Sequence, residues 1–258
     1  MNIIYLLFHG LSPYSGISKK ILHQVKGFEA CGHRVSLCTY SIADNGHRVR
    51  MINNEIIEDY GTGKPAAAKR RVSYQCIYRY AITHQVELIY VRSFHNANPF
   101  TIRLFSKLRK AGIKIAMEIP TYPYDSEYAG FPLVTRLGIQ VDKVFRKTLA
   151  KHVNAIVTFS DYHCIFGQRT IQISNGVDFD SIPLKKTVSK NTSVIHLLGV
   201  AEVHYWHGYD RLIEVWVNIT KTRQTQPYFS TSQEVYGNPK CMIHNTLPDF
   251  MNLSTNII

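Results

Sequence analysis

Asn2-Ile3-Ile4-Tyr5-Leu6-Leu7-Phe8, together with the helical pattern at residues 17–31, decides the class of fold. The first run is apolar at nearly every position, which is typical of a strand covered on both faces of a sheet. In the second segment apolar side chains recur at helical spacing and form one stripe, and Gly32 ends the pattern. A buried strand that leads through a short loop into an amphipathic helix predicts an α/β fold.

Strand and helix patterns continue to alternate as far as residue 174. Further strands are predicted at 34–40, 87–91, 113–119, 154–159 and 171–174, with 51–58 as a candidate, and further helices at 66–85, 99–111 and 135–151. Repeated units of this kind predict a Rossmann-like parallel sheet that is flanked by helices and joined by right-handed crossovers.

The same patterns divide the chain into domains. Residues 1–185 form the first α/β domain, and the polar, basic stretch 186–193 is a linker. A new strand at 194–199 and a following helix begin an incomplete second α/β domain at 194–216. Residues 217–258 lack a period and hold too few apolar residues for a second core, so we expect an aberrant, poorly ordered tail.

Composition narrows the class of protein. Hydrophobic residues make up 45% of the 258 residues, which is enough for a core and argues against disorder. The five cysteines are odd in number and contain no C-x-x-C pair, unlike a disulfide framework or a zinc site. There is no apolar run of about 18 residues, as a membrane span needs, and no cationic leader at the start. These features predict a cytoplasmic protein.

The net charge of +12 predicts an attraction to anionic partners. Nucleic acid, an anionic membrane surface and phosphorylated small molecules all carry such charge. The sequence contains no zinc-finger or RNP motif, so we expect no nucleic-acid partner.

Basic residues gather in two helical segments. One group is Lys64, Lys69, Arg70, Arg71 and Arg79, and the other is Arg136, Lys143, Arg146, Lys147 and Lys151. The second group shares its helix with an apolar stripe of Leu137, Val141, Val144 and Phe145. A basic amphipathic helix suits the anionic inner face of the cell membrane. The simpler alternative is a core stripe beneath a solvated basic face.

A glycine-containing loop, Ser12-Pro13-Tyr14-Ser15-Gly16-Ile17-Ser18, follows the first strand and leads into the first helix. Backbone N–H groups at a helix start favour a phosphate, and a glycine permits its close approach. A glycine that only makes the turn explains the loop equally. The loop is not a G-x-G-x-x-G pattern, which argues against an NAD-binding Rossmann protein.

Two later segments carry a resemblance to a known family. Ile173-Ser174-Asn175-Gly176-Val177-Asp178 and His207-Gly208-Tyr209-Asp210-Arg211-Leu212-Ile213-Glu214, the second preceded by His196-Leu197-Leu198-Gly199, occur at the expected domain crossing. They resemble, in order and spacing, the corresponding segments of glycosyltransferase family 4, which has the two-domain GT-B fold. The resemblance covers about residues 1–214.

The resemblance implies a retaining, hexosyl-type transferase of surface-polysaccharide or glycolipid synthesis. The first domain would bind a glycan or lipid-linked acceptor, and the second a nucleoside-diphosphate sugar as co-substrate, without a metal or other cofactor. The donor-binding residues it implies are Gly16, Asn175, Gly176 and His207.

The sequence departs from the family pattern in its second half. In the family, the second of these segments reads G-R-…-K-G-x-D-x-L-I-E-A. In this chain the arginine is absent after Gly199, and His207 takes the place of the lysine. The family's pair of glutamates in an E-x7-E arrangement is missing, because Glu202, Glu214 and Glu234 have no partner at that spacing. We therefore expect an incomplete donor domain, and a non-catalytic fragment that binds acceptor or membrane is the alternative.

Polar residues end two of the predicted parallel strands, where ligands of open α/β sheets bind. Glu118 ends one strand and is the candidate catalytic residue; Tyr122 and Tyr124 follow it as candidate acceptor-binding residues. Arg92 and His95 end another strand and are candidates for an acceptor phosphate. A rigid Pro-Tyr loop and a surface arginine are the structural alternatives.

Asp178-Phe179-Asp180 matches the D-x-D motif that binds manganese in other glycosyltransferases. Two carboxylates are a poor site for a hard cation, so we expect no metal.

Overall fold

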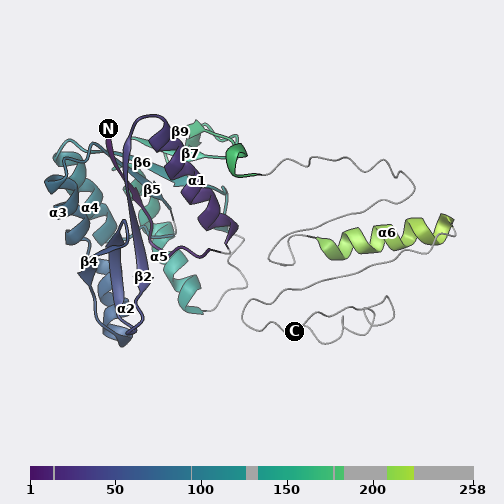
Figure 1. Cartoon of the computed structure of the whole chain (residues 1–258), viewed down its shortest axis with the longest axis horizontal. Coiled ribbons are helices and arrows are strands. Elements are labelled where there is room, and N and C mark those ends of the chain that lie inside the picture. The colour runs from purple at the N-terminus through teal and green to yellow at the C-terminus, as the bar shows by residue number, and fades with distance from the viewer. Residues whose placement is uncertain (14, 94, 126–132, 177, 183–207, 224–258) are drawn as a thin grey trace. The chain divides into compact units, whose positions relative to one another are not determined.

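The computed structural model describes residues 1–13, 15–93, 95–125, 133–176, 178–182 and 208–223 (Figure 1). The chain divides into two units, Met1–Lys185 and Lys186–Ile258.

A nine-stranded sheet forms the centre of the first unit, in the order β4-β3-β2-β1-β5-β6-β7-β9-β8 (Figure 1). The strands are β1 (Asn2–Leu6), β2 (Arg34–Ile42), β3 (Arg48–Ile52), β4 (Glu55–Asp59), β5 (Leu88–Arg92), β6 (Lys114–Ile119), β7 (Ala155–Thr158), β8 (Cys164–Ile165) and β9 (Gln168–Gln172). Pairing is parallel from β2 through β1, β5, β6 and β7 to β9. The predicted Rossmann-like α/β fold is therefore confirmed.

The strand order changes direction beside β1. The chain passes from β1 to β2 on one side and later returns to place β5 on the other side. Such a topological switch point, at the carboxyl ends of the parallel strands, is where open α/β sheets bind ligands.

Among the described residues of the first unit, five α-helices flank the sheet: α1 (Gly16–Ala30), α2 (Gly63–Val72), α3 (Gln75–Thr83), α4 (Pro99–Lys110) and α5 (Leu133–Ala150). Helix α4 begins with a complete capping box, because Asn98 and Thr101 each accept a hydrogen bond from the other's backbone N–H, and Pro99 holds the first helical position.

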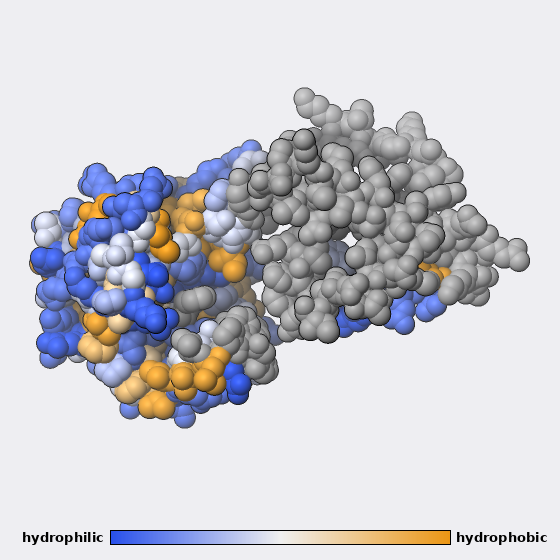
Figure 2. Space-filling model, turned by 90° about the horizontal axis from the view of Figure 1, so that it is seen from below, coloured by the Kyte–Doolittle hydropathy of each residue, from blue (hydrophilic) through white to orange (hydrophobic). Residues whose placement is uncertain are grey.

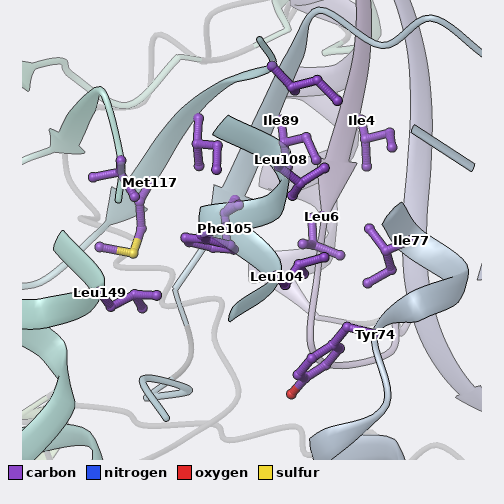
Figure 3. Packing of buried hydrophobic residues seen from close by; sticks show 14 of the residues in the cluster. Ile4, Leu6, Tyr74, Ile77, Ile89, Leu104, Phe105, Leu108, Met117 and Leu149 are labelled. Carbon is purple, nitrogen blue, oxygen red and sulfur yellow. The ribbon is translucent and has the colours of Figure 1, made fainter. Parts of the chain in front are cut away.

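The core has two parts, one on each face of the sheet. Alternate residues of β1 point to opposite faces, so Ile4 and Leu6 join one cluster and Ile3 and Tyr5 join the other. The larger cluster packs under α3, α4 and α5 and includes the side chains labelled in Figure 3. On the other face, Ile21, Val25 and Phe28 of α1 cover the sheet.

Two predicted elements differ in kind from the structure, and the strand predicted at 171–174 begins three residues earlier, as β9 (Gln168–Gln172). The candidate strand at 51–58 is the β3–β4 hairpin, whose turn residues Asn53 and Asn54 have φ values of 49° and 70°. Positive φ at both central residues is the signature of a type I′ turn, which asparagine tolerates. The single helix predicted at 66–85 is divided into α2 and α3, because Ser73 is extended and Tyr74 turns its ring into the core.

The side of α5 that packs on the core is not the apolar stripe that the sequence indicates as the simpler alternative. Leu137, Val141 and Val144 lie on the exposed side of the helix, and the core contacts come instead from Leu149 and Ala150, with Phe145 packed against them. The predicted core stripe is therefore wrong for three of its four residues.

The described part of the second unit is one helix, α6 (Tyr209–Arg223), which covers the helix expected at the start of the second domain. The helix continues to Arg223, so residues 217–223 are helical and the tail expected from residue 217 is wrong for them; residues 224–258 lie outside the described residues. The strand predicted at 194–199 and the candidate donor residue His207 lie outside the described residues. Among the residues that the structure describes, no helix has both the length and the apolar character needed to cross a membrane.

Candidate functional site

The predicted site residues of β5 and β6 lie together at the carboxyl edge of the sheet. Arg92 and Glu118 are register partners at the last positions that these two strands share. The loop after β1 and the start of α1 belong to the same edge, since β1 runs parallel to both strands through the sheet.

Glu118 is fully buried and holds three side-chain donors. Arg92 donates to one carboxylate oxygen, while the Tyr90 hydroxyl (2.8 Å) and the Gln24 amide (3.0 Å) donate to the other. The hydroxyl of Tyr5 in turn donates to the Gln24 carbonyl oxygen at 2.6 Å. Burial, and secondly the Glu118 carboxylate, raises the pKa of both Tyr5 and Tyr90. These residues therefore form a closed polar network, in which both tyrosines are neutral donors.

This network bears directly on the candidate catalytic residue. Both oxygens of Glu118 are engaged by protein groups, and Arg92 is nearly as buried as its partner. The arrangement ties the ends of β5 and β6 to α1. For the carboxylate to reach a substrate, Gln24 would have to move aside.

Two members of this site come from α1 and were not predicted. Gln24 closes the network, and Lys20 lies with its ammonium nitrogen 3.4 Å from the centre of the Phe159 ring. Partial burial lowers the pKa of Lys20. The Glu118 carboxylate acts in the opposite direction, and the Arg92 charge lowers this pKa further. Lys20 and Gln24 are four residues apart on a helix, so they share one face. Two polar residues four positions apart, next to the apolar stripe of α1, are the sequence pattern from which Lys20 and Gln24 could have been predicted.

The other candidate acceptor residues form a second, aromatic cluster. The ring centres of His95 and Tyr124 are 4.5 Å apart, and those of Tyr122 and Tyr124 are 6.5 Å apart. Tyr122 also meets Tyr162 edge-on at 4.9 Å and Phe166 at 5.5 Å. Tyr122 is partly exposed, so it offers an aromatic surface of the kind that suits a sugar ring.

Two carboxylates of different character hold this aromatic cluster. Asp142 is buried and accepts from the Tyr124 hydroxyl at 3.1 Å and from the Ala97 backbone at 2.9 Å. Asp125 accepts a two-pronged pair from Arg146, at 2.7 and 3.1 Å, which holds the pKa of Asp125 below its usual range. Desolvation lowers the pKa of His95.

Gly16 and the Asn175–Gly176 pair belong to two separate segments. Gly16 is the first residue of α1, and Ser15 caps the helix by accepting from the Ser18 N–H at 3.4 Å. A side chain at Gly16 would meet nothing within 4 Å, so packing does not require the glycine. The first N–H groups of any helix lack partners within it, and the expected phosphate contact depends on these groups.

Asn175 and Gly176 are exposed and lie between β9 and a short 3-10 helix, Phe179–Ser181. The segment is tied to α1 because Lys26 donates to Asp178 at 2.7 Å, and Ile173 packs on the cluster beneath α1. The Lys26 contact lowers the pKa of Asp178. Among the described residues, no group of three metal-ligating side chains occurs.

Comparisons of the chain with models of known protein families, with curated proteins and with solved structures find no match. The family resemblance therefore rests on the residues 173–178 and 196–214 themselves.

Proposed function

We propose that the first unit is the acceptor-side domain of a glycosyltransferase that uses a nucleotide sugar. The proposal is supported by the Rossmann-like sheet, by the two family-like segments, and by the gathering of polar and aromatic residues at the carboxyl edge. The observation that carries it is the partly exposed Tyr122 at that edge, with His95 and Tyr124 beside it, because aromatic surfaces flanked by hydrogen-bonding groups suit sugars.

In this proposal the two clusters at the edge have different tasks. The aromatic cluster of Tyr122, Tyr124 and His95 binds the acceptor. The buried Glu118–Arg92 pair keeps the strand ends in place and, through Gln24, fixes α1, whose first turn faces the donor phosphates. Gly16 lies in the first turn of α1, whose backbone N–H groups would stabilise the negative charge of the departing diphosphate.

The experiment is incubation of the purified chain with isotope-labelled nucleotide sugars and a membrane lipid extract. Label in the lipid or glycan fraction supports transfer, and Tyr122→Ala should reduce it by weakening acceptor binding. Phe100→Ala is the matched control, because it removes an exposed ring of α4 that is not part of the aromatic cluster. A titration with NAD tests the dinucleotide-binding alternative, for which we expect no binding.

A second candidate function, docking on an anionic membrane surface, is favoured by the outward face of α5. Leu133, Leu137, Val141 and Val144 are 69%, 58%, 45% and 70% exposed, and they follow one another at helical spacing. Figure 2 shows hydrophobic surface of this kind interrupting the hydrophilic surface of the first unit. Exposed apolar stripes of several residues mark interaction surfaces.

The charges beside this stripe indicate which surface it fits. Arg136 and Lys147 are exposed, and the acidic residue of α5, Asp142, is buried on the opposite side. Lys143 is partly exposed and lies 3.6 Å from the Asp125 carboxylate. An apolar stripe flanked by cations is the pattern of a helix that lies in the interface of an anionic bilayer. A lipid-linked acceptor lies in the membrane, so membrane docking and acceptor binding would then occur at the same surface.

Vesicle co-sedimentation tests this docking. We expect binding to phosphatidylglycerol vesicles and little binding to phosphatidylcholine vesicles. Leu137→Ser with Val144→Ser should weaken binding by on the order of tenfold or more, because two apolar side chains no longer enter the bilayer. Leu22→Ser with Ile82→Ser is the control, since these exposed residues lie on α1 and α3. Equal losses in both pairs would contradict docking through α5.

A further inference from the structure

Three arginines gather around one tyrosine at the edge of the sheet beside the switch point. Arg48 and Arg50 lie two residues apart on β3, and Arg70 comes from α2. Arg48 donates to the Tyr40 hydroxyl at 2.7 Å, and the Arg70 guanidinium lies 4.1 Å from the centre of the same ring. Tyr40 is also the register partner of Arg50 across β2 and β3.

Among the described residues, no carboxylate forms an ion pair within 4 Å of these three arginines, although Glu58 is the register partner of Arg50 across β3 and β4. The nearby acids are engaged elsewhere, with Asp59 accepting from His47 at 2.7 Å and Glu58 lying 3.7 Å from Arg79. Burial lowers the pKa of Arg70, and the neighbouring charges of Arg71, Arg48 and Arg50 lower it further. Like charges held together in a protein interior are costly unless an anion compensates them.

The hydrogen-bonding capacity of the cluster is also incomplete. The Nε atoms of Arg48, Arg50 and Arg70 are buried, and none of them has a hydrogen-bond partner among the described residues. Arg50 is itself only 2% exposed. Buried donors without a protein partner are rare in folded proteins, and a bound water or ion can supply the missing acceptor.

The cluster reaches the first loop of the sheet. Arg50 donates to the carbonyl of Leu7, directly after β1, at 2.7 Å. The backbone of the same loop lies close to β2, because a Cβ on Gly10 would be 2.9 Å from the Tyr40 carbonyl oxygen. The arginines thus stand beside the carboxyl end of β1, where strand order reverses and ligands bind.

We propose that Arg48, Arg50 and Arg70 form a binding site for a phosphate group. Guanidinium groups bind phosphate through paired N–H donors, and three of them supply both the charge and the donors that a dianion requires. Arg48 and Arg70 are partly exposed, so the ligand enters from solvent on their side, while the buried Arg50 fixes the site to β1. The phosphate belongs either to a soluble metabolite or to a lipid headgroup.

The test uses the full chain and inorganic pyrophosphate as the soluble probe, measured by calorimetric titration at low salt. The variant is Arg48→Gln with Arg70→Gln. We expect the Kd to rise about tenfold for each arginine removed, the size of one charge-assisted hydrogen-bonded pair. The control, Arg103→Gln with Lys114→Gln, makes the same change of charge at two exposed positions and should stay within about twofold of the unmodified chain, since distant exposed charges are screened.

A second measurement does not depend on the variants folding. In the unmodified protein, pyrophosphate should shift the ¹⁵Nε–Hε resonances of the three arginines and leave that of Arg103 in place. Vesicles of phosphatidylglycerol and of phosphatidylcholine then identify the source of the phosphate: a loss of phosphatidylglycerol binding in Arg48→Gln with Arg70→Gln assigns a headgroup, and unchanged vesicle binding assigns a soluble ligand. Equal pyrophosphate affinity in both double variants, or unmoved arginine resonances, would overturn the proposal.

Discussion

Replacing Glu118 by glutamine is the most informative single change in the described part of the chain. The substitution keeps the size of the side chain but removes the charge that faces the buried Arg92 guanidinium. It also places an NH₂ group among three donors, from Arg92, Tyr90 and Gln24. Removing one partner of a buried ion pair typically costs about 3–5 kcal/mol. Domains are stable by about 5–15 kcal/mol, so this variant should lose about a fifth or more of its free energy of unfolding.

Urea unfolding followed by circular dichroism measures the effect. Glu55→Gln is the matched control, because Glu55 is exposed on β4 and a surface change of this kind costs at most about 0.5 kcal/mol. Arg92→Met with Glu118→Met removes both charges and should cost less than the sum of its two single changes, with a coupling of about 0.5–3 kcal/mol. If Glu118→Gln unfolds within about 0.5 kcal/mol of the unmodified chain, the buried-pair account is wrong.

Three further changes test other contacts. Gly10→Ala should lower the free energy of unfolding by about 1–3 kcal/mol, because the new Cβ would meet the β2 backbone, whereas Gly16→Ala, which meets nothing, should be neutral in the same thermal-melting assay. Tyr124→Phe should cost about 1–2 kcal/mol by removing a donor from a buried carboxylate of α5, and the exposed Tyr162→Phe should cost nothing measurable. The pKa of His95 is lowered in the folded state, so its contribution to stability is present above about pH 6.5, the unfolded value, and is lost as pH falls through the folded value. His95→Asn, which suits the positive φ there, should flatten the fall in stability between pH 7.5 and pH 5; an unchanged slope would exclude His95 as its cause.

The central parts of the fold could be predicted from the sequence because they follow from local periodicity. The apolar run of β1 and the stripe of α1 have the patterns of elements buried in an α/β sheet, and both lie within one residue or two of the predicted positions. The turn at Asn53 and Asn54 was missed because two asparagines are a weaker hairpin signal than asparagine followed by glycine.

Long-range packing explains what the sequence could not predict. Helix α5 carries apolar residues on more than one side, so periodicity alone does not decide whether Leu137 or Leu149 faces the core. Arg92 and Glu118 were expected at neighbouring strand ends and are register partners there, but the contact of Gln24 with Glu118 depends on how α1 crosses the sheet, 94 residues away in the chain. The arginine cluster likewise joins two strands and a helix, and no local motif marks it.

The measurement that tests the proposed glycosyltransferase most directly is sugar transfer at a membrane surface. The full chain is bound to phosphatidylglycerol vesicles that contain a membrane lipid extract, and a panel of labelled nucleotide sugars is added. Because the expected donor domain is incomplete, transfer requires that residues 186–258 still hold a nucleotide sugar. On that condition we predict label in the lipid fraction with at least one donor, and less label for Leu137→Ser with Val144→Ser, which we expect to leave the vesicles. A folded chain that sits on the vesicles and transfers no label from any donor would contradict the account.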